Sequence, residues 1–273
     1  MPSQTMHALG ALAMNLIALT SACPTRAGLT TTSAAAQAGQ GTWYGESCGE
    51  EPCWQKGPCA FVDYVLPAGI DGSTCVSETI WDNAYQCGGC VSITYQGKKK
   101  IAMITNKTGG NAQHLDMSPN MFSQLADKSL GEIGIQWEHV PCPIASPLQV
   151  RMHGGASQYW FAATVENAVY RTAKMEVSSD QGATWKPTTR DVNNFFKLEG
   201  NGGTGSATAW VRVTSETGSQ VVLKDVQMKS ETTTKAGRTT PRNDTPSKAT
   251  THYGQTQALN VFLLHVHTLP RLV

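Results

Sequence analysis

The sequence predicts a mainly β protein with two domains, of which only the first is rich in cysteine. The 273 residues include 26 Gly and many Thr, whereas long runs of Leu, Ala and Glu are scarce, a composition that favours strands and turns. Short segments in both halves alternate apolar and polar residues, as half-buried strands do. All eight Cys lie between positions 23 and 142, so we expect a disulfide-linked domain before an unlinked one.

The charge balance and the cysteine spacing exclude several classes of protein. Lys and Arg number 21 against 20 Asp and Glu, for a net charge of +1. Nucleic acid is therefore not an expected partner, because phosphate binding requires a basic excess or stripe. Cys87-Gly-Gly-Cys90 could serve a metal, but zinc usually requires a second such pair or a His pair. The sequence has no second such Cys pair, and His114 and His139 are far apart along it. We expect disulfides formed in an oxidising compartment, no metal and no cofactor.

The N-terminus has features of an export signal. Ala8–Ala22 is an apolar run shorter than a membrane span, although no Lys or Arg precedes it. We therefore expect residues 1–22 to be a signal peptide, 23–40 to be a small and polar spacer, and the protein to be secreted and extracellular. Cleavage after Cys23 would leave seven Cys, an odd number.

The first domain is expected over 41–142. Alternation predicts strands at 91–95, 101–104 and 133–137, the first two joined by the basic turn 97–100. One helix is expected before the last strand, because Ser118 suits an N-cap and Pro119 suits the first helical position. Gly131 is placed to end that helix.

The second domain is expected over 148–229, after a linker at 143–147 in which Pro143 and Pro147 break the strand pattern. Apolar alternation recurs near 148–152, 161–165, 175–177, 211–213 and 221–223. Short strands separated by turns every eight to twelve residues are typical of a β-sandwich.

The last segment, 230–273, is expected to be a Thr-rich disordered tail because Pro interrupts its polar runs. Asn243-Asp-Thr245 is an N-glycosylation sequon in this tail, so we expect Asn243 to carry a glycan. The apolar residues 258–273 resemble a lipid-anchor signal, but polar residues interrupt them, and we do not favour an anchored surface form.

His114-Leu-Asp-Met-Ser-Pro119 is the sharpest local motif. Asp116 stands just before the predicted helix start, where the helix dipole favours a carboxylate. Taken alone, such an Asp is more often a helper of the helix cap than a binding group. The functional interpretation is an acid group presented at a groove.

Large aromatic residues support the functional interpretation. The first half places several of them in Cys- and Gly-rich loops: Trp43, Tyr44, Trp54, Trp81 and Tyr85. In the second half, Tyr159 and Trp160 are adjacent. Consecutive side chains of a strand point to opposite faces, so at least one of this pair should be exposed on a regular strand. Exposed rings of this kind stack on the apolar face of a sugar.

Taken in order, these motifs resemble those of the expansin family, over roughly residues 40–229 and more closely in its microbial form. The shared motifs are Gly41-Thr-Trp-Tyr-Gly45, Cys87-Gly-Gly-Cys90, His114-Leu-Asp-Met-Ser-Pro119, Ile135-Gln-Trp137, Tyr159-Trp-Phe161, Met175-Glu176, Gly182–Trp185 and Asp191-Val-Asn-Asn-Phe195. The resemblance implies a six-stranded double-psi β-barrel followed by an immunoglobulin-like β-sandwich that binds cellulose.

The resemblance also implies site residues in the groove of the barrel. The family's Thr and first Asp correspond to Thr42 and Asp116, and Asn106 replaces its second Asp. Trp43 and Tyr44 are further groove candidates. Asn106-Lys-Thr108 is a second sequon, but we expect Asn106 to stay unmodified because the groove encloses it.

The sandwich of the family carries a row of three aromatic residues. Tyr159 and Trp160 match two of them, whereas the third position falls near Val192. Phe195 or Phe196 is therefore the expected substitute in substrate binding.

By resemblance to the plant members, two disulfides are implied. Cys90 would pair with Cys142, and Cys48 with Cys87. The resemblance leaves open the partners of Cys53, Cys59 and Cys75.

Three functions are compatible with these features. The family implies loosening of plant cell-wall polysaccharide without hydrolysis. Related endoglucanases that share the barrel imply glycoside hydrolysis. The third function is binding alone.

Hydrolysis requires two carboxylates about 5–9.5 Å apart. Asp116 can be the general acid, but Asn106 cannot be its partner, which leaves other carboxylates to fold into the groove: Glu46, Asp63, Asp71, Glu78 or Asp82. We expect a monomer that is not an enzyme and binds cellulose, with xyloglucan and xylan as further candidates.

Overall fold

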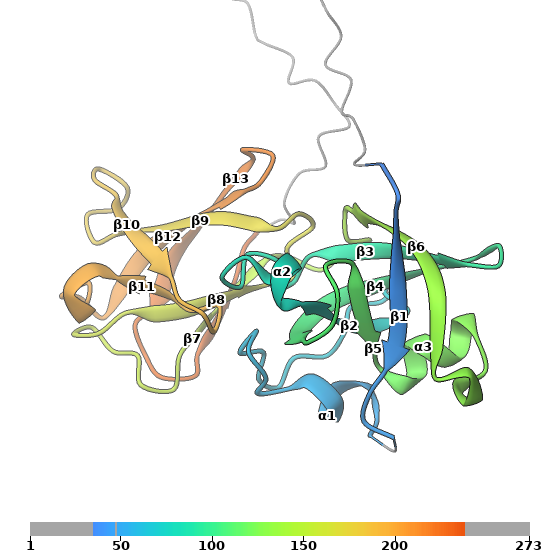
Figure 1. Ribbon diagram of the computed structural model, residues 1–273. Helices are drawn as coiled ribbons and strands as arrows, with labels where there is room; N and C mark the ends of the chain where they lie inside the picture. Colours follow the sequence, from blue (N-terminus) through green and yellow to red (C-terminus); the bar gives the residue numbers. More distant parts are fainter. Residues whose placement is uncertain (1–34, 47, 238–273) are drawn as a thin grey trace, which may run out of the picture. The chain divides into compact units, whose positions relative to one another are not determined.

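The computed structural model describes residues 35–46 and 48–237, which form a β-barrel followed by a β-sandwich (Figure 1). The mainly β architecture predicted from the sequence is confirmed. The predicted signal peptide, most of the predicted spacer and Asn243 lie outside the described residues.

Six strands close the barrel in the order β1-β5-β2-β4-β3-β6. β1 pairs with β5, and β2 with β4, in parallel, and the other neighbours are antiparallel. The strands are β1 (Gln37–Trp43), β2 (Gly72–Ser77), β3 (Cys90–Tyr95), β4 (Lys98–Thr108), β5 (His114–Met117) and β6 (Glu132–Val140). Alternation identified β6 correctly because one of its faces is buried: Ile133, Ile135 and Trp137 all point into the core. The strand predicted at 91–95 is also present as β3, although its first four residues are all buried.

The first strand begins earlier than the sequence predicts. β1 starts at Gln37, inside the predicted spacer 23–40, so the barrel domain does not begin at 41. Its small residues give no apolar–polar alternation, so the sequence does not reveal the strand. They are small because the neighbouring strands pack closely against them. A Cβ at Gly39 would lie 2.4 Å from Gln113 O and 2.8 Å from Trp137 Nε1.

The helices of the barrel domain are short: α1 (Glu50–Trp54), α2 (Glu78–Trp81), α3 (Pro119–Leu125) and the 3₁₀ turn η1 (Lys128–Leu130). α3 begins as predicted, since Ser118 Oγ accepts a hydrogen bond from Met121 N at 3.2 Å. Its predicted end was wrong: Ala126 is already extended, with φ −148°. Gly131, with φ 66°, instead ends η1.

The sandwich is one continuous sheet of eight strands that folds over its own core. Its order is β13-β12-β9-β10-β11-β8-β7-β14. β10 joins the two halves, because Lys186 and Pro187 pair with β9 and the next three residues pair with β11. The bounds are β7 (Gln149–Met152), β8 (Ala162–Glu166), β9 (Thr172–Ser178), β10 (Lys186–Arg190), β11 (Phe196–Leu198), η2 (Glu199–Asn201), β12 (Thr208–Ser215), β13 (Gln220–Gln227) and β14 (Thr233–Lys235).

The sandwich also extends beyond its predicted end. β14 pairs with β7 from Thr233↔Arg151 to Lys235↔Gln149, and Ala236 is buried. The predicted disordered tail therefore does not begin at 230. Thr favours strands as well as polar linkers, so composition alone did not separate the two.

The disulfides correct one implied pairing. The structure holds Cys90–Cys142, as the resemblance implies, but Cys48 pairs with Cys53 and Cys87 with Cys59. The implied Cys48–Cys87 bond is wrong because both cysteines have other partners. Cys48 is bonded to Cys53, five residues later in α1, and Cys87 is bonded to Cys59.

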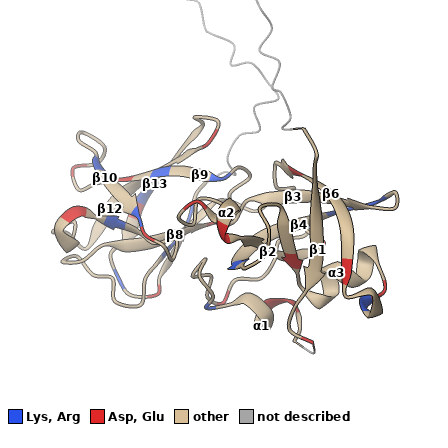
Figure 2. Cartoon of the chain, viewed as in Figure 1, with Lys and Arg blue, Asp and Glu red and all other residues tan. Residues whose placement is uncertain are grey.

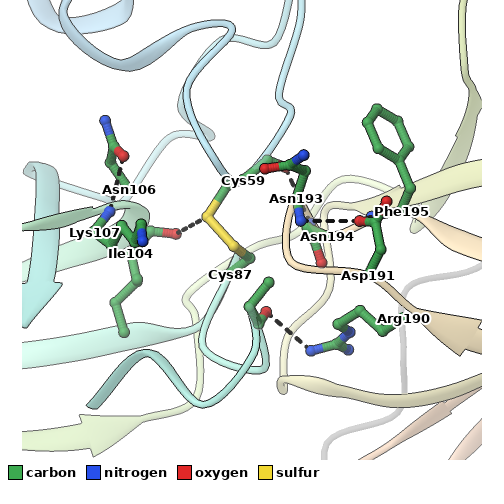
Figure 3. Close-up of a disulfide and its surroundings, with 11 residues drawn as sticks. Cys59, Cys87, Ile104, Asn106, Lys107, Arg190, Asp191, Asn193, Asn194 and Phe195 are labelled. Atoms are coloured by element: carbon green, nitrogen blue, oxygen red, sulfur yellow. Dashed lines mark hydrogen bonds between the residues drawn. A yellow bond between two sulfur atoms is a disulfide. The ribbon is translucent and has the colours of Figure 1, made fainter. Parts of the chain in front are cut away.

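Loops of the barrel domain are hydrogen-bonded to the sandwich beside the Cys59–Cys87 disulfide (Figure 3). The buried Asn194 donates through Nδ2 to Cys59 O at 3.1 Å. Arg190 donates to Ala84 O at 3.0 Å. The disulfide therefore holds the loop that receives a buried side chain of the sandwich.

Candidate functional site

Thr42 and Asp116 meet on the outer face of the barrel. They are register partners on β1 and β5, and partners in a sheet point to the same face. Thr42 Oγ1 donates to Asp116 Oδ1 at 2.5 Å, and Thr108 Oγ1 donates to Oδ2 at 3.5 Å. The structure thus brings together the Thr and Asp that the sequence singles out.

His114 extends this chain of hydrogen bonds and was not predicted as a site residue. Its Nε2 lies 2.7 Å from Thr42 Oγ1, and its Nδ1 lies 2.9 Å from Gly109 O. A carbonyl only accepts, so Nδ1 must donate. The Thr42 hydroxyl therefore lies within hydrogen-bonding distance of both His114 and Asp116. The spacing His-Leu-Asp signalled this arrangement, because residues two apart in a strand share a face.

Asp116 and Asn106 are linked through β2, which lies between their strands. Cys75 is the register partner of Asp116 on one side and of Asn106 on the other. Cys75 is a buried free thiol. Burial, with the Asp116 charge second, raises its pKa to about 12. Asn106 is half-buried, accepts from Lys107 N at 2.8 Å, and its Nδ2 would lie 2.9 Å from a Cβ at Gly57.

The other aromatic groove candidates differ in position. Tyr44 lies beside Cys75, and burial foremost raises the pKa of its phenol well above 10. Trp43 points away from Thr42, as its neighbour in a strand must. Its Nε1 donates to Lys128 O at 3.1 Å, and the Lys128 ammonium lies 5.0 Å from the ring centroid. Trp43 therefore packs against η1 and not beside Asp116.

The other carboxylates named from the sequence are held elsewhere or exposed. Ion pairs join Asp63 to Arg151, Asp71 to Lys100 and Glu78 to Lys107. The two hydrogen bonds to the Asp116 carboxylate come from threonines. The site is suited to accepting hydrogen bonds from sugar hydroxyls, which are stronger to a charged acceptor.

The aromatic pair of the sandwich is not on a strand, contrary to the prediction. Tyr159 and Trp160 occupy a tight turn closed by a bridge between Ser157 and Trp160, and β8 begins only at Ala162. Tyr159 is 74% exposed, whereas Trp160 is half-buried. The exposed ring is thus observed, but a turn and not strand alternation exposes it.

His153 joins Trp160 to Phe195. Its ring lies edge-on to both, with centroids 5.0 Å from Trp160 and 4.6 Å from Phe195. Of the two expected substitutes, Phe196 is buried, so only the half-buried Phe195 can offer a surface. Phe195 also lines a hollow with Lys56 and Gly57, the loop that contacts Asn106.

Charge is dispersed over the described residues. Lys and Arg, and Asp and Glu, are scattered over both the barrel and the sandwich in Figure 2. Among the described residues, no three His, Cys, Asp or Glu gather as a metal site would require. No helix within 35–46 and 48–237 is long and apolar enough to cross a membrane.

Known proteins similar in sequence are expansins. No protein-family model matches the chain. It is 27% identical over 209 residues to Expansin-B2 of Oryza sativa subsp. japonica, covering 68% of this chain and 79% of that protein. Expansin-B1 of Zea mays is 23% identical over 207 residues, covering 68% and 76%. Expansin-like protein 6 of Dictyostelium discoideum is 24% identical over 182 residues, covering 58% and 60%.

Two solved structures share the architecture. Apo-Clavibacter michiganensis expansin superposes with a TM-score of 0.66 at 24% identity, covering 75% of this chain and 97% of that one. A point mutant of the same expansin in complex with cellohexaose gives 0.65 at 23% identity, with the same coverage. The fold is therefore that of the two-domain bacterial expansin, a six-stranded barrel followed by a sandwich.

The chain is thus similar in sequence to plant and amoebal expansins and shares the fold of the bacterial one, in agreement with the resemblance that its motifs carry.

Proposed function

We propose that this protein is secreted and loosens plant cell walls by gripping cellulose-type glucan chains between Asp116 and the aromatic residues of the sandwich. The observation that carries the proposal is the Thr42–Asp116 hydrogen bond of 2.5 Å on the outer face of the barrel. The hydrogen-bond partners of the Asp116 carboxylate are threonines, so this carboxylate can accept hydrogen bonds from the hydroxyls of a glucan. Hydrolysis would require a second carboxylate beside it.

The sandwich supplies the second contact. Tyr159 is 74% exposed, and Trp160 and Phe195 flank His153 beside it. Large rings with one open face stack on the apolar faces of sugars. A Clavibacter expansin that shares this fold was crystallised with cellohexaose, which supports a cellulose-type glucan as the ligand.

Binding to insoluble cellulose tests the proposal. Tyr159→Ala with Trp160→Ala should weaken binding about tenfold, because each stacked ring contributes about 0.5–1.5 kcal/mol. Tyr159→Phe keeps the ring and should bind like wild type. Trp210→Ala is the matched control, because it removes an aromatic ring away from the turn. Trp210 lies on β12, where its ring centroid is 4.6 Å from the Lys224 ammonium of the neighbouring strand β13. Equal losses in the double variant and in Trp210→Ala would show that the turn is not the cellulose contact.

A further inference from the structure

A second polar hollow lies on the barrel, on the far side of Thr42 from Asp116. It has a volume of about 460 Å³ and is formed by β1, β6 and the loop before β5, strands that lie side by side in Figure 1. Four polar side chains line it: Gln40, Asn111, Gln113 and Glu132. None of them belongs to the site described above.

The strand register places this hollow next to Thr42, on the side away from Asp116. Thr42 is the partner of Asp116 on β5 and of Glu132 on β6, so all three side chains share the outer face. Neighbouring strands are about 4.8 Å apart, so Glu132 stands roughly 10 Å from Asp116 across the sheet. A glycan that crosses the strands over Asp116 and Thr42 therefore reaches Glu132 next.

The polar groups of the hollow are oriented by their own hydrogen bonds. Asn111 Nδ2 donates to Gln40 Oε1 at 3.0 Å, and Asn111 Oδ1 accepts from Gln113 N at 3.0 Å. Among the described residues, no bond is made by the amide nitrogen of Gln40 or the carboxylate of Glu132. The Gln40 amide nitrogen therefore offers hydrogen-bond donors and the Glu132 carboxylate offers acceptors to a ligand that can use both, as a sugar hydroxyl can.

Gly134 keeps the floor of the hollow open. It is the register partner of Gln40, and no atom lies within 4 Å of where its Cβ would be. It lies within β6 and is not among the positive-φ residues, so a larger side chain fits there without backbone strain. The open space thus results from a missing side chain, which a substitution can supply.

We propose that this hollow is an additional glycan subsite, which takes the neutral sugar unit next to the one held by Asp116. The amides of Gln40, Asn111 and Gln113 and the Glu132 carboxylate bind its hydroxyls. Glu132 is the one charged residue that lines the hollow, so the subsite disfavours a uronic acid there. The inference rests on the proposed function, because it needs a glucan chain at Asp116.

The test is an NMR titration of the full ¹⁵N-labelled chain with cellohexaose. We expect the side-chain amide signals of Gln40, Asn111 and Gln113 to shift together with backbone amides around Asp116. In Gly134→Val the valine side chain fills the hollow. The side-chain amide signals of the hollow should then not shift, whereas the backbone amide signals around Asp116 should shift as in wild type. Glu132→Gln should weaken cellohexaose binding about fivefold, since it replaces a charge-assisted hydrogen bond. Gln136→Val, on the same outward face of β6 but outside the hollow, is the matched control.

The outcomes separate the two claims. Shifts around Asp116 without shifts in the hollow, or an unchanged response in Gly134→Val, would overturn the subsite and leave the proposed function standing. Wild-type protein whose barrel signals do not move at all would overturn both. Shifts of equal size with a trigalacturonide would contradict the neutral-sugar assignment.

Discussion

Thr42 shows how much of the site a single residue can organise. Its hydroxyl connects Asp116 to His114, two side chains on the same strand β5. Thr42 and Asp116 could be predicted because each lies in a contiguous motif. Cys75 could not be placed, because its position between Asp116 and Asn106 depends on the pairing of β2 with strands distant in sequence.

Cys75 gives a prediction at this scale. Because burial raises its pKa to about 12, the group is a thiol and not a thiolate at pH 8, and thiols react slowly. We expect iodoacetamide to leave Cys75 unlabelled in the native protein and to label it after unfolding without reductant. Peptide mapping by mass spectrometry reads both states, and Cys75→Ser identifies the peptide. Rapid native labelling would mean that the floor of the site is open.

At the scale of elements, the sequence predicts strands well where one face is buried and poorly where packing requires small residues. Trp137 and its alternating neighbours mark β6, whereas Gly39 conceals β1. Disulfide connectivity is beyond local pattern, since eight Cys allow 105 pairings. Only a folded chain shows that Cys59 approaches Cys87, with Cα atoms 5.5 Å apart.

The corrected pairing predicts unequal stabilities. Cys59–Cys87 closes 28 residues and Cys48–Cys53 only five, so the entropic contributions are about 3–4 and about 2 kcal/mol. Cys59→Ser with Cys87→Ser should therefore lower the melting temperature more than Cys48→Ser with Cys53→Ser. Differential scanning calorimetry measures both. A larger loss from the Cys48–Cys53 pair would contradict the assignment.

At the scale of the whole molecule, a half-buried histidine lies where the barrel and the sandwich are hydrogen-bonded to each other. His139 Nε2 is 3.5 Å from Arg171 Nη1, and Arg171 also donates to Gln86 at 2.6 Å and to Glu216. Burial, followed by the Arg171 charge, lowers the pKa of His139 from 6.5 to about 4. The sequence offered no sign of this, because Arg171 and His139 approach each other only in the folded chain.

This lowered pKa makes stability depend on pH. Between pH 6.5 and 4 the unfolded histidine binds a proton that the folded one does not, so the contribution is complete above pH 6.5 and is lost as pH falls toward 4. The shift corresponds to at most about 3 kcal/mol. Urea unfolding at pH 7 and pH 4.5 should show that wild type loses more free energy of unfolding than His139→Gln. Equal losses in both proteins would remove His139 from the account.

Wall extension by Asp116→Asn tests the central claim, that Asp116 grips glucan without a catalytic partner. The variant should lose most of the extension of isolated plant walls while its cellulose binding is kept and its free energy of unfolding stays within about 2 kcal/mol of wild type. Asp225→Asn, a change at an exposed position with φ 54°, should leave extension intact. Wild type should release no reducing sugar above background. Undiminished extension by Asp116→Asn, or sugar release by wild type that this variant abolishes, would contradict the account.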